Sequence, residues 1–380
     1  MEKYDYIIIG AGASGLLLAS AMAKDSFFDS KRILLLDKNA KKTNDRTWCY
    51  WEKGPGQFDA LVSNEWKTVH FESKKLSQRT QIAPYTYKMI KGIDFYSHYL
   101  NEINLSSSIT FLQEEVMDIE ENHKLVTIRT KNNTYTSSYV FNSIFDYAMA
   151  KNQQHYPVLQ QHFMGWVIQT KNPVFDPKEI TYMDFSIPQK GNTRFMYVLP
   201  YSSQMALIEY TLFSEHLLDK PEYEEELKTY IKKRFQCHSY EITEKEFGSI
   251  PMTTYDFREN HTKRIRYIGT AGGWAKPSTG YTLMSTAKKI PLLIDHIKNN
   301  TPLKKLNLKN KFWYYDLLFL DVLYKDNANG YKVFESLFNK LKPQKVFKFL
   351  DEETNLIEDL NFIAACPKLP FIKAFFKRLF

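Results

Sequence analysis

The chain has 380 residues, of which 43% are hydrophobic and 25% charged, a composition typical of a folded protein with more than one structural unit. The formal net charge is +8, and residues 286–380 carry most of it, with 17 Lys or Arg against 10 Asp or Glu. No zinc-finger spacing or Arg-rich run accompanies this basic region. This argues against nucleic acid and leaves two interpretations, a membrane surface or a solvated basic face.

Cysteine, histidine and hydrophobic spacing exclude further classes. The cysteines Cys49, Cys237 and Cys366 stand far apart without a CxxC pair, which favours a reducing compartment. The nine histidines show no paired metal spacing, so no metal site is expected. The N-terminal apolar run ends at Gly10, too early for a signal peptide, and no run of about 18–20 apolar residues predicts a membrane span. We expect a cytoplasmic protein with at most peripheral membrane contact.

The first 40 residues predict a βαβ unit. Residues 6–9 form a β-branched run typical of a buried parallel strand, residues 16–24 predict a helix, and residues 32–36 predict a second buried strand. A GxGxxG loop, residues 10–15, lies between the first strand and the helix. The motif has the structural context that a dinucleotide site requires.

Each glycine of this loop has a physical role. Gly10 allows a tight turn, Gly12 lets a pyrophosphate approach the backbone, and Gly15 lets the helix pack closely on the strand. The N–H groups at the start of the helix, around Ser14, attract phosphate. Asp37 ends the second strand, 22 residues after Gly15, where its carboxylate can accept hydrogen bonds from ribose hydroxyls.

The remaining elements follow in chain order. Residues 44–52 predict an aromatic loop and residues 86–104 a helix. Strands are expected over residues 110–112, 125–129, 139–145, 163–170, 180–185, 194–199, 205–213 and 266–268. A charged helix is expected over residues 220–236, and after a second glycine loop at 269–280 the chain is expected to be helical to its end.

This order predicts an α/β fold in which a discontinuous Rossmann-type FAD-binding domain carries an inserted antiparallel β substrate domain, as in flavin hydroxylases, and a helical C-terminal tail. The expected boundaries are 1–80, 106–155 and 255–290 for the FAD-binding domain, 81–105 for a helical insertion, 156–254 for the substrate domain and 291–380 for the helical, basic C-terminal region. FAD is preferred to NAD because the second glycine loop returns late in the chain, where it can hold the far end of a long cofactor. Thr270 stands where many flavin hydroxylases have Asp, which argues against an ordinary hydroxylase.

Several segments, in the same order, resemble the bacterial lycopene cyclase family. They are YDYIIIGAGASGLLLA at the N-terminus, NDRTWCYW at 44–51, QHFMGW at 161–166, YMDF at 182–185, LIEYT at 207–211 and KPSTGY at 276–281 with the preceding glycine pair. Two positions depart from the family pattern: Ser186 replaces an arginine and Tyr210 replaces an acidic residue. The resemblance covers residues 4 to about 285.

The resemblance implies a lycopene β-cyclase of the isomerase class. Such an enzyme closes the linear ends of lycopene into β-ionone rings, giving γ-carotene and β-carotene in carotenoid biosynthesis without net redox change. It also implies FAD in its reduced form, NAD(P)H as the reductant, and lycopene and related acyclic carotenoids as substrates. Ring type, the number of ends cyclised and the oligomeric state stay open.

Glu209 is the expected catalytic acid. Cyclisation starts when a terminal alkene is protonated, and burial in an apolar strand raises the pKa of a carboxyl so that it keeps its proton near neutral pH. The resemblance points to the same position, although the flavin is an alternative source of the first proton. An exposed glutamate on an edge strand is the structural alternative.

Aromatic and polar side chains are expected around the substrate and the cofactor. Trp48, Trp166 and Trp274 are candidates for a substrate pocket that stabilises the cation, as are Tyr50 and Trp51, although aromatics are more often core residues. Asp184 is interpreted either as a further polar group of that pocket or as a turn residue. The residues expected around the flavin end of FAD are Gly272, Gly273, Thr279 and Gly280.

Two basic features have two interpretations each. Arg46 is expected either to contact the FAD pyrophosphate or to form a surface ion pair with Asp45 or Glu52. The apolar stripe within residues 370–380 is expected either to meet lipid, beside its lysines, or to pack on the protein.

Two other functions compete with the cyclase. One is an FAD-dependent isoprenoid reductase or monooxygenase of the same fold, which would consume nicotinamide in proportion to product. The other is a non-catalytic escort protein, which would purify without flavin.

Overall fold

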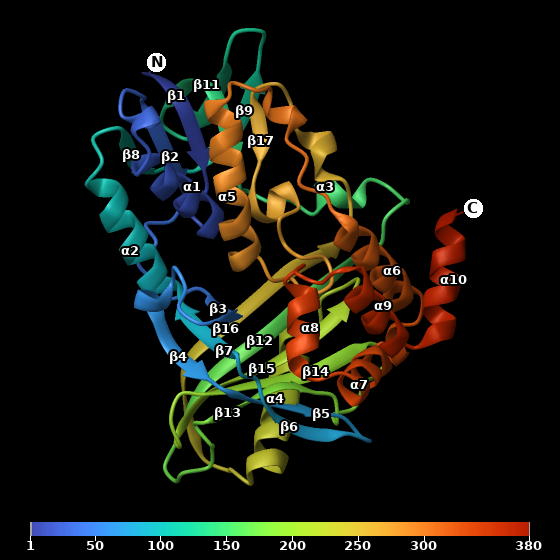
Figure 1. Cartoon of the computed structure of the whole chain (residues 1–380). Helices are drawn as coiled ribbons and strands as arrows, with labels where there is room; N and C mark the ends of the chain where they lie inside the picture. The colour runs from blue at the N-terminus through green and yellow to red at the C-terminus, as the bar shows by residue number, and fades with distance from the viewer. Residues whose placement is uncertain (1, 380) are drawn as a thin grey trace. The chain divides into compact units, whose positions relative to one another are not determined.

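The computed structural model describes residues 2–379, which form two compact units. The first unit comprises Met1–Trp48, Ile90–Tyr156 and Thr254–Lys311, and the second Cys49–Met89, Pro157–Thr253 and Phe312–Phe380. Each unit therefore joins segments that are distant in the sequence, as the colours of Figure 1 show.

The first unit is built on a largely parallel sheet. Its strands are β1 (Glu2–Ile9), β2 (Ile33–Asp37), β8 (Ile109–Gln113), β9 (Val116–Glu121), β10 (Val126–Thr130), β11 (Thr134–Asn142) and β17 (Ile265–Tyr267). β1 lies between β2 and β11 and is parallel to both, β8 extends the sheet beyond β2, and β17 is parallel to β11. The connections diverge to opposite sides of β1, so its carboxyl end is the usual ligand position of such a sheet.

Burial explains why β1 and β2 form the centre of this sheet. Ile7 and Leu34 pack on one face and Ile8 and Leu35 on the other, and all four are fully buried. The helices of this unit are α1 (Ala13–Ala23), α2 (Gly92–Asn104), α3 (Ala148–Lys151) and α5 (Leu283–Lys298). α5 packs beside α1, so the late segment of the chain returns to the first helix (Figure 1).

The second unit contains a seven-stranded sheet in the order β16-β12-β15-β14-β13-β5-β6. Its strands are β5 (Thr68–Glu72), β6 (Ser77–Gln81), β12 (Val158–Thr170), β13 (Glu179–Asp184), β14 (Thr193–Pro200), β15 (Met205–Ser214) and β16 (Tyr240–Thr253). Neighbouring strands are antiparallel except β13 and β5, which are parallel. A smaller sheet, in the order β3-β7-β4, consists of β3 (Thr47–Lys53), β7 (Tyr85–Lys91) and β4 (Val62–Trp66).

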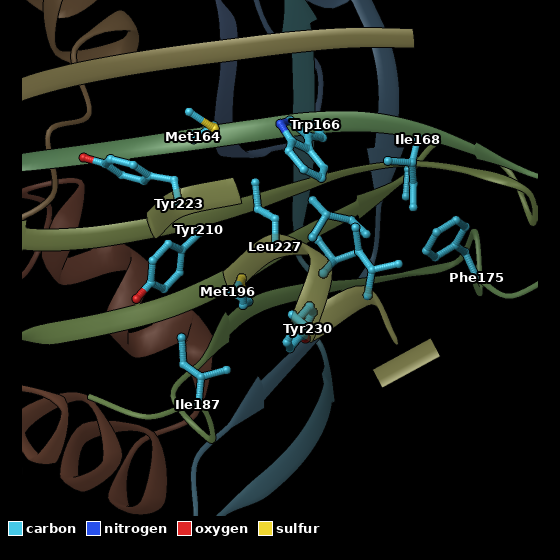
Figure 2. Packing of buried hydrophobic residues seen from close by; sticks show 14 of the residues in the cluster. Met164, Trp166, Ile168, Phe175, Ile187, Met196, Tyr210, Tyr223, Leu227 and Tyr230 are labelled. Atoms are coloured by element: carbon cyan, nitrogen blue, oxygen red, sulfur yellow. The ribbon is translucent and has the colours of Figure 1, made fainter. Parts of the chain in front are cut away.

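Helix α4 (Lys220–Phe235) covers one face of the large sheet. Alternate strand residues such as Trp166, Met196 and Tyr210 pack against Tyr223 and Leu227 of this helix (Figure 2). The side chains between them in the sequence point to the other face.

Five helices form the C-terminal region: α6 (Lys311–Lys325), α7 (Tyr331–Lys340), α8 (Pro343–Leu350), α9 (Leu356–Ala365) and α10 (Lys368–Leu379). Stacked rings hold α7 and α8 against the sheets of the second unit: the ring centroids of Phe338 and Phe71 are 4.3 Å apart, and those of Phe347 and Trp51 are 4.5 Å apart. None of the helices between residues 2 and 379 has the length and apolar character to cross a bilayer.

The structure differs from the expected domain and element boundaries in five places. Residues 49–80 join the second unit, and so do residues 312–380. The expected helical insertion at 81–105 begins with strand β7, because Tyr87 and Met89 are buried in a sheet and the helix starts only at Gly92. The expected loop at 44–52 contains strand β3, and the long strand β16 was not expected.

Candidate active site

The first glycine loop joins β1 to α1 and has the three properties that its glycines predict. Gly10 has a φ of +95°, and a Cβ atom at Gly15 would lie 1.9 Å from the carbonyl oxygen of Gly10. A Cβ atom at Gly12 would have no described atom within 4 Å. The loop is therefore tightly packed at Gly15, against the backbone of Gly10, and has open space beside Gly12, as a phosphate-binding loop requires.

The start of α1 completes a cradle for an anion. No side chain of the described residues caps this helix at Gly12, so the first N–H groups, which lack intrahelical partners, are available to a phosphate. Asp37 anchors the loop, because its Oδ2 accepts the N–H of Ala11 at 2.7 Å, and it lies 3.3 Å from Nζ of Lys41. These groups fit a dinucleotide.

The second glycine loop follows β17 and contacts the first helix. A Cβ atom at Gly269 would lie 2.3 Å from Oγ of Ser14, and Gly273 has a φ of +70°. A Cβ atom at Gly272 would lie 2.4 Å from the carbonyl oxygen of Tyr267. These glycines are required by the turn itself, and their contact with a flavin stays a prediction.

Residues 276–281 form a tight turn before α5. Gly280 has a φ of +71°, and its N–H donates to the carbonyl oxygen of Lys276 at 2.8 Å. Thr279 Oγ1 accepts the N–H of Tyr281 at 3.3 Å. The turn is thus held by its own hydrogen bonds, which explains the residue types of this motif without a ligand.

Arg46 is exposed, and within residues 2–379 its side chain forms a single, long ion pair. Its Nε lies 3.9 Å from Asp45, while the same carboxylate accepts the hydroxyl of Tyr96 at 2.7 Å. Glu52, the other expected partner, instead lies 2.9 Å from Nζ of Lys88. The guanidinium is therefore available to a ligand, and its contact with a pyrophosphate stays a prediction.

Glu209 lies at the centre of the large sheet and not at an edge. It is in register with Tyr197 of β14 on one side and with Gly165 of β12 on the other. Gly165 is in turn in register with Glu246 of β16. Directly paired residues point to the same face, so Tyr197, Glu209 and Glu246 share the face opposite α4. We call these three residues and Gly165 the glutamate row.

The carboxyl of Glu209 is poised to hold a proton. Burial raises its pKa, and the negative charge of Glu246 and a hydrogen bond between the two carboxyl groups add to this shift, so that the pKa reaches about 8. The hydroxyl of Thr211 donates to Oε1 and has the opposite effect on the pKa. The side chain is only half-buried, so it combines a proton at neutral pH with access for a ligand.

Further polar groups adjoin the glutamate row. The hydroxyls of Tyr197 and Tyr87 are 2.7 Å apart, and Tyr197 also forms a hydrogen bond with Cys49. Burial raises the pKa of the Cys49 thiol well above its usual range, so this group is a neutral thiol at pH 7. Glu246, Tyr197 and Tyr87 were not expected from the sequence, since they come from separate strands whose register only the structure shows.

Aromatic rings border the acid on the same face. Thr211, two residues along β15 from Glu209, is in register with Phe163 and Phe195. The ring of Phe195 lies 5.6 Å from that of Phe213, a third residue of this face. Ring faces on the same side of the sheet as the acid can stabilise a cation formed from an apolar substrate.

Trp166 is on the wrong face to take part in this chemistry. It is in register with Ile208, is 1% exposed, and packs in the cluster under α4 (Figure 2). Nζ of Lys245 lies 5.1 Å from its ring centre. The prediction that Trp166 stabilises a cation beside Glu209 is wrong, because Gly165 occupies the site face and strand alternation turns its neighbour away.

Asp184 is also a core residue, and its assignment to the substrate pocket is wrong. It is fully buried and accepts the hydroxyl of Tyr230 and the N–H of Ser186, each at 2.8 Å. Its register with Met196 places it on the α4 face. The turn interpretation describes its contact with Ser186.

Tyr210, which replaces an acidic residue of the family pattern, points to the α4 face as well. Its buried hydroxyl accepts Nη1 of Arg194 at 2.9 Å, and the same nitrogen lies 2.8 Å from Glu222. A residue adjacent to Glu209 on a strand points away from it, so this replacement leaves the glutamate row unchanged.

Two other tryptophans belong to the first unit. Trp48 lies 4.9 Å from the ring of Phe95 and is half-buried, so its role at the substrate stays a prediction. Trp274 is 1% exposed, and its indole N–H has no hydrogen-bond partner within residues 2–379. Trp274 therefore offers almost no surface to a substrate.

The contact of Asp184 predicts a structural role that stability measurements can test. Tyr230→Phe removes a donor from a buried carboxylate, so we expect a loss of about 1–3 kcal/mol in the free energy of unfolding. Denaturant titration measures this loss, and Tyr240→Phe, at a half-buried tyrosine of the same unit, is the control. Equal stability of the two variants would contradict the prediction.

The comparisons with known proteins agree with this geometry. A family profile described as lycopene cyclase protein matches residues 5–375. The chain belongs to the lycopene cyclase family. The predicted family is thereby confirmed over nearly the whole chain, whereas no curated protein matches it.

Solved structures show the fold class of this lycopene cyclase family member. A geranylgeranyl bacteriochlorophyll reductase-like protein from Thermoplasma acidophilum aligns over 98% of both chains at 13% identity, with a TM-score of 0.62. A flavoprotein/dehydrogenase from Cytophaga hutchinsonii aligns over 100% of this chain and 99% of its own at 13% identity, with a TM-score of 0.64. A flavin-dependent brominase aligns over 99% of both chains at 14% identity, with a TM-score of 0.59. The predicted α/β flavoprotein fold with a helical C-terminal region is confirmed.

Proposed function

We propose that the chain is an FAD-dependent lycopene β-cyclase, which closes the linear ends of lycopene into β-ionone rings. The observation that carries this proposal is the half-buried residue Glu209, whose carboxyl has a pKa raised to about 8, on a sheet face with aromatic rings, in a member of the lycopene cyclase family. Protonation of an alkene needs an acid that keeps its proton at neutral pH among apolar groups.

The reaction balances without net redox change. Glu209 donates its proton to the terminal alkene, which leaves a tertiary carbocation. The neighbouring alkene attacks this cation and forms the ring bond, and loss of a proton from the ring gives the β-ionone product. The rings of Phe163, Phe195 and Tyr197 lie on the same sheet face as Glu209 and offer electron density to the cation.

FAD is the proposed cofactor, with Gly10, Gly12, Gly15 and Asp37 holding its adenosine diphosphate part. Reduced FAD supplies an electron-rich ring system that stabilises positive charge, and NAD(P)H is the proposed electron source. The open backbone at Gly12 and the uncapped start of α1 support this assignment.

The test is pigment analysis in a bacterium that accumulates lycopene, combined with a measurement of how much NAD(P)H the purified protein oxidises for each ring formed. We expect β-carotene, with γ-carotene on the way, and far less nicotinamide oxidised than rings formed. Unchanged lycopene beside a soluble yellow flavoprotein would contradict the proposal. A reduced or oxygenated product, with one nicotinamide oxidised for each product formed, would favour the isoprenoid reductase or monooxygenase. A protein that purifies without flavin would favour the escort role.

We further propose peripheral binding of the cytoplasmic protein to an anionic membrane through α9 and α10. Large apolar side chains are exposed along both helices, at Leu356, Ile357, Leu360, Ile363, Leu369, Ile372, Phe375, Phe376 and Leu379. Lys368, Lys373 and Lys377 are exposed among them on α10. Apolar side chains flanked by lysines match the boundary between acyl chains and anionic headgroups, where a carotenoid substrate is dissolved.

Vesicle flotation tests this surface. We expect Leu360→Ser combined with Phe376→Ser to weaken binding to phosphatidylglycerol vesicles at least ~10-fold, since each apolar side chain contributes about 1.5–3 kcal/mol when buried. Leu105→Ser, at a 90% exposed leucine of the first unit, is the control. Undiminished flotation of the double variant would refute the proposed membrane face.

A further inference from the structure

The two glutamates of the glutamate row are placed to act together. β12 separates their strands, and a residue with a side chain at the middle position would stand between them. The residue there is Gly165, and a Cβ atom on it would lie 2.9 Å from Cγ and 3.0 Å from Oε1 of Glu246. The Glu246 side chain therefore lies over the glycine, where its carboxyl forms a hydrogen bond with that of Glu209.

We propose that Glu246 is a positioning residue that shares a single proton with Glu209, and that the absence of a side chain at Gly165 allows this sharing. The delivery of that proton to an alkene rests on the proposed cyclase function, whereas the sharing itself does not.

Electrostatics explains why the pair keeps one proton. Two carboxylates in contact at a partly buried site repel each other, so one of them stays protonated at neutral pH. The other titratable groups that adjoin the pair are Cys49, Tyr197 and Tyr201, which are a thiol and two phenols. The exposed carboxylate of Glu244 acts on Tyr201 and makes no contribution to the pKa shift of Glu209. After burial, the pKa of Glu209 responds most to Glu246, so this partner governs the proton.

The pair also accounts for the return of the proton. When Glu209 donates, its O–H bond breaks and a C–H bond forms at the alkene, which leaves two negative charges on the pair. The closed ring then loses a proton from the carbon beside the cationic centre, and the doubly charged pair accepts this proton, which re-forms the O–H bond. One proton leaves and one returns, so the acid is regenerated without an outside donor.

Infrared titration of the full-length flavoprotein tests the shared proton directly. The protonated carboxyl band of Glu209 is assigned by its loss in Glu209→Gln, and we expect it to titrate near pH 8. In Glu246→Gln the like charge is gone, so the midpoint is expected to fall by at least about one pH unit. Glu244→Gln, at an exposed glutamate of the same strand, is the matched control and is expected to leave it unchanged. An unchanged midpoint in Glu246→Gln would overturn the proposal.

Gly165→Ala provides a second variant that keeps both carboxyls. Its methyl group would meet Cγ of Glu246 and Cδ1 of Leu207, each at 2.9 Å. Displacement of Glu246 from this position is expected to lower the midpoint in the same direction. The alkaline limb of the cyclisation rate is expected to move by the same amount as the infrared midpoint, with little change in KM. If the infrared midpoint falls in the variants as expected but the wild type forms no rings, the shared proton is supported and only the cyclase function is rejected.

Discussion

Glu209→Gln is expected to reduce lycopene cyclisation by at least ~10²–10⁴-fold, because the amide has no proton acidic enough to protonate an alkene. The substitution conserves shape and can still accept the Thr211 hydroxyl, so the protein is expected to remain folded. The acid lies in the second unit and the glycine loop in the first, and flavin content is therefore expected to match the wild type.

Pigment analysis in the lycopene-accumulating strain measures this loss, with flavin absorbance and thermal unfolding of the purified variant as controls for folding. Glu244→Gln is expected to retain wild-type activity. A Glu209→Gln protein that still converts lycopene at a tenth of the wild-type rate or faster would remove Glu209 from the role of acid.

The pKa of Glu209 gives the same assignment a pH signature. The protonated form is the active one, so the wild-type rate is expected to fall as the pH rises through about 8. The folded pKa lies above the ordinary value of 4.5, so the group stabilises the fold at low pH and loses this contribution as the pH rises from 4.5 to about 8. Glu209→Gln is therefore expected to be more stable than the wild type at pH 9, even though it is inactive.

The sequence predicts Glu209 but not its partners, and the reason is physical. An apolar strand that contains one carboxyl indicates a raised pKa from local residues alone. The register that places Tyr197 and Glu246 in line with Glu209 depends on three strand pairings between segments far apart in the chain. Such pairings cannot be inferred from the local pattern of a single sequence. The absence of a side chain at Gly165 is a local trace of this arrangement.

The errors over Trp166 and Asp184 have a related origin. Alternation along a strand separates neighbours into two faces, yet it does not say which face meets α4 and which meets the substrate. Both residues lie in motifs that resemble the family, and both are held in the α4 core by packing or hydrogen bonds. A motif therefore identified the right strands but not the right side of the sheet.

The nucleotide-binding part was the most predictable because its signals are local. Glycine spacing, a β-branched strand and a following helix lie within 24 residues, and each has one structural solution. Residues 92–104 are helical as expected, whereas residues 85–91 form a strand. Met89 and Ile93 have helical spacing, but the pairing of β7 with β3 and β4 decides the structure of residues 85–91. Long-range pairing again overrode a local pattern.

Gly12→Val is expected to weaken FAD binding at least ~100-fold without unfolding the protein, because a side chain there would occupy the space of the pyrophosphate. Gly12 has a φ of −80° and a ψ of −170°, an extended backbone that valine adopts readily, and no described atom lies within 4 Å of its Cβ position. The substitution therefore changes the ligand site and leaves the fold intact.

Gly15→Ala is the matched comparison, since its Cβ atom would lie 1.9 Å from the carbonyl oxygen of Gly10. The chain must shift to relieve this contact, so the flavin-free variant is expected to lose at least about 1–3 kcal/mol of stability. FAD titration followed by flavin fluorescence and thermal unfolding of both flavin-free variants separate the two effects. If Gly12→Val bound FAD like the wild type, the cofactor would not approach the backbone at this loop. Phosphate binding at the start of α1 would then no longer explain why the loop contains three glycines.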